Sequence, residues 1–154
     1  MATLAQRTTI DATVHVTTSR PTQFIDITER IQALVRESGI ACGILNVQTL
    51  HTTTGIVVNE HEPLLLDDFG STLEAVAPSG GAYRHDSAAR TVNVTADERR
   101  NGHAHCRALL VGVSTSLNVV GGALRLGRWQ RIFFAELDGP QDRAISVVVV
   151  GELG

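Results

Sequence analysis

Histidine is the residue type in this chain best suited to chemistry, and the sequence carries six, His15, His51, His61, His85, His103 and His105. A neutral imidazole can bind a metal ion or carry a proton near neutral pH. None of the six shows the spacing of a zinc finger or of an H-E-x-x-H helix. Any metal site must therefore be assembled from segments that lie far apart in the sequence.

His51 stands where an apolar stretch ends in a turn of Thr52, Thr53, Thr54 and Gly55. Three hydroxyl groups beside an imidazole suit a ligand site, and a glycine lets the backbone approach a ligand closely. The same residues also suit a plain strand-end turn in which threonine serves β-structure. The residues alone leave these two interpretations evenly balanced.

For the other histidines and for Glu60, the predicted secondary structure indicates which side chains could reach a site. If residues 101–111 form a helix, His103 and His105 point in different directions. His105 then lies on the side expected to face inward and is the better metal candidate. His85 falls in a loop and is by default exposed. Glu60 lies at a strand-to-helix junction, where it is either a general base, a partner that fixes a histidine tautomer, or a helix-capping acid.

Two further segments carry polar groups that could contact a ligand. Arg128 and Gln130 flank Trp129, the only tryptophan, which is more often a packing residue but could grip an anionic or ring-containing ligand with its neighbours. Ser114 lies in a glycine- and serine-containing segment that could offer N–H and hydroxyl groups to a phosphate. This segment lacks the lysine of a P-loop, which disfavours nucleotide hydrolysis.

The elements that must position these residues follow from hydrophobic periodicity. Alternation predicts a strand over 8–17, and helical spacing predicts a helix over 26–39 that ends at Gly39. Further strands are predicted over 40–50, 56–59, 116–120, 123–126, 132–137 and 144–150, and further helices over 62–76 and 101–111. Gly121-Gly122 predicts a two-residue hairpin turn. Because strands outnumber helices and do not strictly alternate with them, we expect an α+β fold with a largely antiparallel β-sandwich.

Three packing expectations accompany this assignment. Cys42 and Cys106 lie far apart and in no C-x-x-C arrangement, and both are predicted to be reduced core residues. Cys106, Leu109 and Leu110 are predicted to form the inward face of the helix over 101–111. The last strand is apolar on both faces, so both faces are expected to be covered.

The composition limits the classes of protein to which this chain can belong. The chain has 154 residues, the size of one domain, with 43% hydrophobic and 19% charged residues. A formal net charge of −3 offers no positive field for nucleic acid, and no apolar stretch is long enough for a membrane span. The N-terminal residues lack the pattern of a signal peptide, so we expect a cytoplasmic protein. The low charge content favours an oligomer.

Seven segments occur in the order that is typical of the YjbQ family, and on these motifs the chain resembles that family from about residue 10 to Glu152. They are His51-Thr-Thr-Thr-Gly55, Asn59-Glu60, Tyr83-Arg84-His85, Asn101-Gly-His-Ala-His105, Gly112-Val-Ser114, Gly127-Arg-Trp-Gln130 and Glu136-Leu-Asp-Gly-Pro140. The resemblance implies a compact α+β sandwich that assembles as a homotrimer. It also implies a secondary thiamine-phosphate synthase activity, which joins a pyrimidine pyrophosphate to a thiazole phosphate.

The resemblance also assigns residues. It implies a divalent metal, with zinc favoured and magnesium as the alternative, held by His51, His85 and His105. We take Glu60 and His103 as candidate catalytic residues. The candidate contacts to a phosphorylated substrate are Asn59, Thr52, Thr53, Ser114, Arg128, Trp129, Gln130 and Arg143.

The chain departs from the family pattern at four positions. Thr54 stands where the family usually has Ala, Asp86 where Asn is common, Arg128 where Thr is usual, and Gln141 where Arg is usual. Arg128 adds charge beside the expected substrate site, which puts substrate preference in doubt. Three imidazoles favour zinc, whereas pyrophosphate chemistry favours magnesium. Two alternatives therefore stay open: a metal-dependent hydrolase or lyase on a small phosphorylated or carbonyl metabolite, and a non-catalytic trimeric ligand-binding module.

Overall fold

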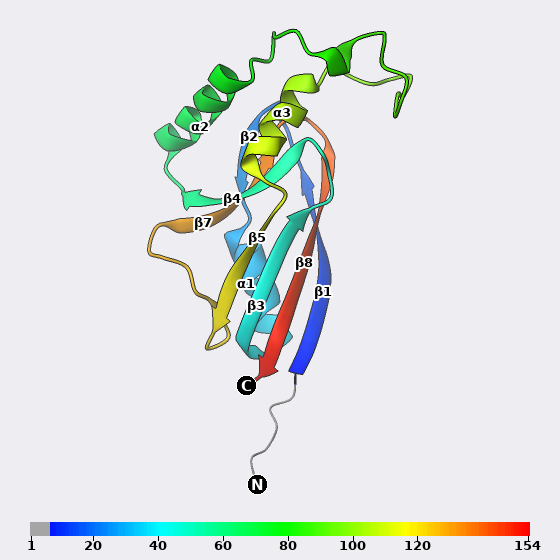
Figure 1. The fold of residues 1–154 in the computed structure, drawn as a ribbon. Helices are drawn as coiled ribbons and strands as arrows, with labels where there is room; N and C mark the ends of the chain where they lie inside the picture. The colour runs from blue at the N-terminus through cyan, green and yellow to red at the C-terminus, as the bar shows by residue number, and fades with distance from the viewer. Residues whose placement is uncertain (1–6) are drawn as a thin grey trace.

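The computed structural model describes residues 7–154, which form two antiparallel sheets with three α-helices (Figure 1). The larger sheet has the order β1-β8-β3-β5-β6, with strands Arg7–Thr17, Asp142–Leu153, Ile40–Thr49, Ser114–Val120 and Ala123–Leu124. The smaller sheet has the order β2-β7-β4, with strands Gln23–Asp26, Gln130–Glu136 and Thr54–Glu60. The expected α+β fold with antiparallel sheets is confirmed.

The core lies between the inner faces of the two sheets and the helix α1, Thr28–Ser38. In β1 the alternation places Val14 and Val16 inward and leaves threonines outside, as predicted. The carboxylate of Asp26 accepts a hydrogen bond from the Thr28 N–H at 2.9 Å and so serves the start of α1. Gly39 ends the helix with a φ of 69°, a conformation that glycine adopts without strain.

The two remaining helices lie outside the core, at the end of the molecule where the three-residue 3₁₀ helix η1, Arg84–Asp86, is found (Figure 1). The helix α2, Pro63–Val76, matches the predicted range and is capped by the Glu62 side chain, yet none of its residues is buried. The helix α3 spans Gly102–Val111. The strand β2 and η1 were not predicted from the sequence.

The inward face of α3 differs from the prediction. Its buried residues are Gly102, Ala104 and Arg107. Leu109 and Leu110 are exposed instead, and so is Cys106. Arg107 turns inward because its guanidinium donates to the Ala77 carbonyl at 2.9 Å and also binds Thr22 and Glu74. Polar contacts with α2, with the residue that follows α2 and with the segment before β2 therefore set the orientation of α3.

The expectation for the two cysteines was also wrong. Both cysteines are free, but Cys42 and Cys106 are exposed and not core residues. The outer face of β8 is open in the single chain, since Val150 is 46% exposed. The turn after β7 carries the chain from the smaller sheet into β8 of the larger one. No helix among residues 7–154 is long and apolar enough to cross a membrane.

Candidate functional site

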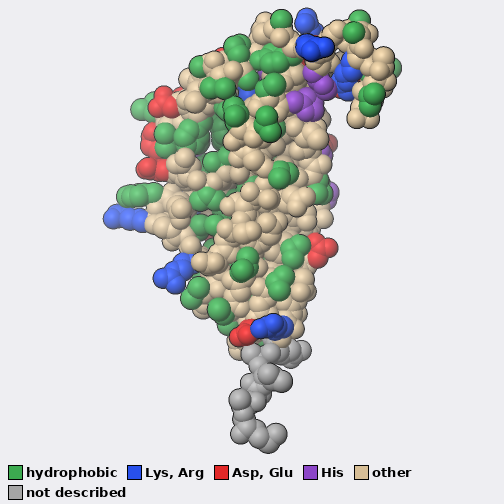
Figure 2. Space-filling view, in the orientation of Figure 1, with side chains coloured by type: hydrophobic (Ala, Val, Ile, Leu, Met, Phe, Trp, Pro, Cys, Tyr) green, Lys and Arg blue, Asp and Glu red, His purple; other side chains and the backbone are tan. Residues whose placement is uncertain are grey.

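A polar cavity of about 520 Å³ lies where the β3–β4 turn, η1, the start of α3 and the β7–β8 turn meet. Histidine side chains gather at this end of the molecule (Figure 2). The cavity is lined by Thr52, Thr53, His85, Arg90, Asn93, Asp97, Glu98, Arg99, Asn101, His105, Asp138, Gln141 and Arg143. Five of the predicted site residues are thus brought together from distant segments, namely Thr52, Thr53, His85, His105 and Arg143.

Arg143 and Glu136 form a buried ion pair beneath this cavity. The Arg143 Nε and Nη2 atoms donate to the two Glu136 oxygens at 2.7 Å each, and Nη2 also donates to Thr53 Oγ1 at 3.1 Å. Burial raises the pKa of Glu136, but hydrogen bonds from Arg143 and the Asp138 N–H outweigh it and leave the pKa below its ordinary value. Glu136 is therefore ionised and fixes the guanidinium in place.

The third guanidinium nitrogen of Arg143, Nη1, forms no hydrogen bond within residues 7–154. Among those residues only Gln32 Nε2 and Asn101 Oδ1 are buried side-chain polar atoms without a partner. Because Nη1 is not one of them, it keeps solvent-accessible surface, and Arg143 lines the cavity. Arg143 thus presents a rigidly held, positively charged N–H donor to the cavity.

The three threonines after His51 have different roles. Thr52 is exposed at the cavity, and Thr53 is buried and accepts from Arg143. Thr54 bonds inside the turn to Thr49 and to the His51 carbonyl. Gly55 does allow a close approach, but the neighbour is α3, because an added Cβ would lie 2.3 Å from Val111 Cγ1. The glycine serves helix packing and not ligand access.

His85 and His105 face one another at the cavity, with ring centroids 4.5 Å apart. Burial lowers the pKa of His105, and the neighbouring His85 lowers it further. His105 is accordingly neutral at neutral pH. The Nε2 atom of His85 lies 3.1 Å from Arg90 Nη1, and Arg90 in turn forms an ion pair with Glu98 at 2.7 Å.

The start of α3 is fixed by two carboxylates. Asp86 Oδ1 accepts from the backbone N–H groups of Asn101 and Gly102 at 3.0 and 2.9 Å. The Asn101 side chain donates to Asp138 Oδ2 at 3.0 Å, which directs its oxygen Oδ1 to the other side. Asp86 stands where the family usually has Asn, and its carboxylate satisfies two donors that begin this helix.

His51 is not part of the cavity wall. Its Nε2 accepts a hydrogen bond at 2.9 Å from the backbone N–H of Ala144 in β8. Because a backbone N–H can only donate, the neutral ring carries its proton on Nδ1, and neither nitrogen is free to bind a metal in this arrangement. Burial lowers the pKa of His51, and nearby Arg143 lowers it further, so the ring stays neutral. His51 ties the β3–β4 turn to β8.

Five other predicted residues lie at the far end of the β4–β7 pair: Asn59, Glu60, Arg128, Trp129 and Gln130. Thr54 pairs with Glu136 at the cavity end, whereas Glu60 pairs with Gln130. Six residues of strand separate these two pairs, about 20 Å. The Arg128 guanidinium lies 4.5 Å from the centre of the Trp129 ring and stacks on it. Within a single chain, these five residues therefore lie away from the polar cavity.

Ser114 and His103 also lie outside the cavity lining. Ser114 begins β5, opposite Gln48, and is exposed. His103 is next to Tyr83, with ring centroids 6.3 Å apart, and burial lowers its pKa.

The donor set of the cavity does not fit the three-histidine metal site that the resemblance implies. A catalytic zinc site uses three protein ligands and keeps one open position. The structure places His85 and His105 together, while His51 is engaged with β8. Among residues 7–154, no three side chains of His, Cys, Asp or Glu lie close enough to hold a metal ion.

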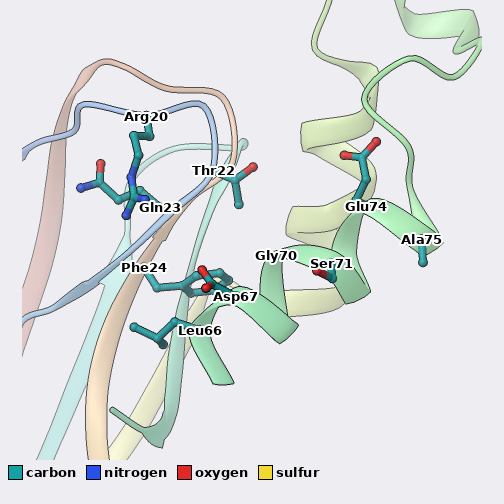
Figure 3. Close-up of a pocket in the computed structure, with 10 residues that line it drawn as sticks. All are labelled: Arg20, Thr22, Gln23, Phe24, Leu66, Asp67, Gly70, Ser71, Glu74 and Ala75. Carbon is teal, nitrogen blue, oxygen red and sulfur yellow. The ribbon is translucent and has the colours of Figure 1, made fainter. Parts of the chain in front are cut away.

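A larger cavity, of about 700 Å³, lies away from the histidines, between α2 and the segment that leads into β2 (Figure 3). Phe24 and Leu66 contribute apolar surface, and Arg20 and Asp67 contribute charges of opposite sign. Gly70, in the middle of α2, has no atom within 4 Å of the position of an added Cβ. None of the candidate residues from the sequence lines this cavity.

Several residues of the polar cavity were not recognised from the sequence. Arg90, Asn93, Asp97, Glu98 and Arg99 lie in an irregular segment without periodic pattern, which gives no signal of a site. From the sequence, Asp138 was expected only to lie in the turn after the strand over 132–137. Gln141 was noted only because it departs from the family pattern. The only signal in the sequence for these site residues was the buried strand before this turn, because loops that follow buried strands often carry functional residues.

Comparisons with known proteins agree on one family. The family model described as "UPF0047 protein YjbQ-like" matches residues 12–152. A UPF0047 protein of Methanothermobacter thermautotrophicus is 42% identical over 135 residues, which cover 88% of this chain and 87% of that protein. These two matches span nearly all of the described strands and helices.

Solved structures give the same result. A YbjQ-like protein of unknown function from Sulfolobus solfataricus is 32% identical with a TM-score of 0.86, covering 96% of this chain and all of that chain. An uncharacterised conserved protein of the YjbQ/UPF0047 family from Clostridium acetobutylicum is 37% identical with a TM-score of 0.79, covering 90% of this chain and 98% of that chain. The chain therefore belongs to the UPF0047, or YjbQ-like, family.

Proposed function

We propose that the protein is an enzyme that acts on a phosphorylated small molecule in the polar cavity. The observation that carries this proposal is the open Nη1 of Arg143, held beneath the cavity by Glu136. A guanidinium fixed by a carboxylate on one side and open on the other is suited to a phosphate, because its donors need no reorganisation when the anion binds. The exposed Thr52 beside it offers a hydroxyl donor.

The reaction that we propose is the thiamine-phosphate synthase chemistry implied by the resemblance. The thiazole nitrogen attacks the methylene carbon of the pyrimidine, a C–N bond forms, and the C–O bond to pyrophosphate breaks. Negative charge then accumulates on the departing pyrophosphate. Arg143 Nη1 and the Thr52 hydroxyl are placed to stabilise that charge, and the neutral ring of His105 can donate an N–H without adding a second buried cation.

We also propose that the chain assembles as a homotrimer through the outer face of β3, β5 and β8. This face carries exposed apolar side chains, with Ile44 57%, Val120 47% and Val150 46% exposed. Charged outward residues stand only at the two ends of β8, Asp142 and Glu152, and the outward residues between these ends are small or uncharged: Cys42, Asn46, Gln48, Ser114, Ser116, Asn118, Ala144, Ser146 and Val148. The view over these strands in Figure 2 accordingly shows few charged side chains. An uncharged, partly apolar sheet face of this kind is typical of a protein interface.

The proposed reaction is tested by incubating the purified chain with the pyrimidine pyrophosphate and the thiazole phosphate and measuring thiamine phosphate and pyrophosphate. We expect product from the natural sequence and a reduction of about tenfold or more for Thr52→Val, since a hydrogen bond to a charged group is lost. Thr9→Val is the matched control, because Thr9 is exposed and pairs with Val150, at the other end of β1 from Thr17, which pairs with Asp142 beside the β7–β8 turn.

Two results would overturn the proposal. The first is the absence of product together with the absence of any change in the NMR signals of His85 and His105 when the thiazole phosphate is added. The second is an equal effect of Thr52→Val and Thr9→Val on product formation.

A further inference from the structure

The carboxylate of Asp138 is held at the polar cavity by only one of its two oxygens. Asp138 lines the cavity and is 9% exposed. Its Oδ2 atom accepts hydrogen bonds from Asn101 Nδ2 at 3.0 Å and from Gln141 Nε2 at 3.4 Å. The nearest cation to Oδ1, Arg99 Nη2, lies 3.7 Å away and donates to the Asp138 backbone carbonyl instead. Within residues 7–154, Oδ1 therefore accepts no hydrogen bond.

This free oxygen can be reached from outside the protein. Asp138 Oδ1 is not among the buried side-chain atoms of residues 7–154 that lack a partner, so it keeps solvent-accessible surface. The rest of the side chain is almost fully buried, and a carboxylate oxygen in such a place is stabilised by a hydrogen-bond donor. A donor from a ligand in the cavity would supply what the protein does not.

Asn101 adds a second unused acceptor to the same wall of the cavity. It also lines the cavity and is 9% exposed, and its Oδ1 atom is buried without a partner. Because the other end of this amide donates to Asp138, the unpartnered atom is the carbonyl oxygen, which can only accept. Two neighbouring side chains thus both have acceptor capacity that no protein donor uses. This pattern points to a ligand that donates.

The β7–β8 turn places opposite requirements on a ligand. Arg143 offers a donor to the cavity, and Asp138 offers an acceptor to the same cavity of about 520 Å³. A ligand that satisfies both carries an anionic group and an N–H donor. A neutral amino group suits the acceptor better than an ammonium group does, because Arg99 already places a positive charge 3.7 Å from Asp138 Oδ1.

We propose that Asp138 Oδ1 binds an amino group on the heterocyclic ring of the substrate, and that Asn101 positions the carboxylate for this contact. The proposal rests on the proposed function, in which the phosphate lies at Arg143, and it assigns the ring to the other side of the cavity. A hydrogen bond to a carboxylate is stronger than one between neutral groups. A ring that carries an acceptor in place of the amino group would bring two acceptors together and would be rejected.

Asp138→Asn should reverse this preference. Two donors converge on the position of Oδ2, so the amide oxygen of the new side chain is expected there and its NH₂ group in the place of Oδ1. The probes are 4-aminopyrimidine and 4-methoxypyrimidine, which carry a donor and an acceptor at the same ring position. Their dissociation constants are measured by NMR titration of the full chain at a pH where both rings are unprotonated. We expect the natural chain to bind the amino compound about tenfold or more tightly than the methoxy compound, and Asp138→Asn to prefer the methoxy compound.

Asp142→Asn is the matched control, since Asp142 is an exposed acid at the start of β8 and outside the cavity lining. It removes the same charge and should change the preference by less than about threefold. Asn101→Ala should lower the preference for the amino compound without reversing it, because the carboxylate remains but loses a donor that holds Oδ2. In the natural chain, the side-chain amide signal of Asn101 should shift when 4-aminopyrimidine is added.

The proposal is overturned if the natural chain binds neither pyrimidine or does not distinguish them, or if Asp138→Asn keeps the preference for the amino compound. Should Asp138→Asn fail to fold, as judged by circular dichroism, Asn101→Ala and the Asn101 signal decide, and an unchanged preference or an unmoved signal would count against the proposal. Inorganic pyrophosphate, titrated separately, reports on the phosphate contact. Pyrophosphate that binds without any pyrimidine preference would contradict this inference alone, whereas a pyrimidine preference without pyrophosphate binding would contradict the proposed function alone.

Discussion

The carboxylate of Glu136 binds Arg143 through two bonds of 2.7 Å, and the pair is almost fully buried beneath the cavity. The same carboxylate accepts from the N–H groups of Leu137 and Asp138 and from the Thr18 hydroxyl. One side chain thus joins the β7–β8 turn, the end of β1 and the predicted phosphate contact. Loss of Glu136 should therefore affect both stability and ligand binding.

Glu136→Gln tests this coupling. We expect a loss of about 3–5 kcal/mol in the free energy of unfolding, because Arg143 is left buried without its counter-charge. Urea unfolding followed by circular dichroism measures it. Glu152→Gln is the control, since the Glu152 side chain is half-exposed and forms only a 3.9 Å ion pair with Arg7; it should cost less than about 0.5 kcal/mol. Equal stability of the two variants would contradict a structural role for the buried pair.

Asp26 should make the protein sensitive to acid. Burial raises its pKa, but hydrogen bonds from Thr28, Arg131 and His61 outweigh it and lower the pKa to about 2. The folded state therefore holds the proton more weakly than the unfolded chain, and the stabilisation is present above pH 4 and is lost as the pH falls toward 2. It amounts to about 2 kcal/mol.

Asp26→Asn should remove this contribution. At pH 7 the variant should be less stable than the natural sequence, and the difference should shrink as the pH falls from 4 to 2. Urea midpoints measured across this range test the prediction. Asp11→Asn, at an exposed position on β1, should keep the natural pH dependence. A difference between Asp26→Asn and the natural protein that stays constant with pH would refute the assignment.

The sequence predicts those elements whose signals are local. The alternation in β1, the glycine that ends α1, the range of α2 and the Gly121-Gly122 turn depend on neighbouring residues, and the structure shows each of them. The short strand β2 was missed because its four residues, Gln23–Asp26, have no alternating burial and exist as a strand only through pairing with β7. The inward face of α3 was mistaken because Arg107 is held by polar contacts with distant loops.

The candidate site was only partly predictable for the same reason. Thr52, Thr53, His85, His105 and Arg143 belong to motifs and do line one cavity. Arg90 and Glu98 belong to an irregular segment, and their roles arise from a contact with His85 that no spacing indicates. His51 looks like a ligand in the sequence, yet its Nε2 faces a backbone amide of β8. A motif identifies a residue, but only the fold shows which of its atoms are free.

His51 should therefore behave as a structural residue. His51→Ala leaves the Ala144 N–H without its acceptor, and we expect a loss of about 1–3 kcal/mol in unfolding free energy. Because the pKa of His51 is lowered in the folded state, its contribution is present above the unfolded pKa near 6.5 and is lost as the pH falls below it. His15→Ala, at an exposed position on β1, is the control.

The uncharged face of the larger sheet gives the last prediction. Ile44 and Val150 are neighbours there, since they pair directly across β3 and β8. Ile44→Lys or Val150→Lys should place a charge in the proposed interface, where it would be desolvated without a partner. We expect a trimer for the natural sequence and a monomer for either variant, measured by sedimentation equilibrium. Leu64→Lys, at a 72% exposed apolar position on α2 and outside the sheet, should leave the trimer intact. A natural chain that sediments as a monomer at micromolar concentration would overturn the proposed assembly and leave the apolar face of β3, β5 and β8 without a partner.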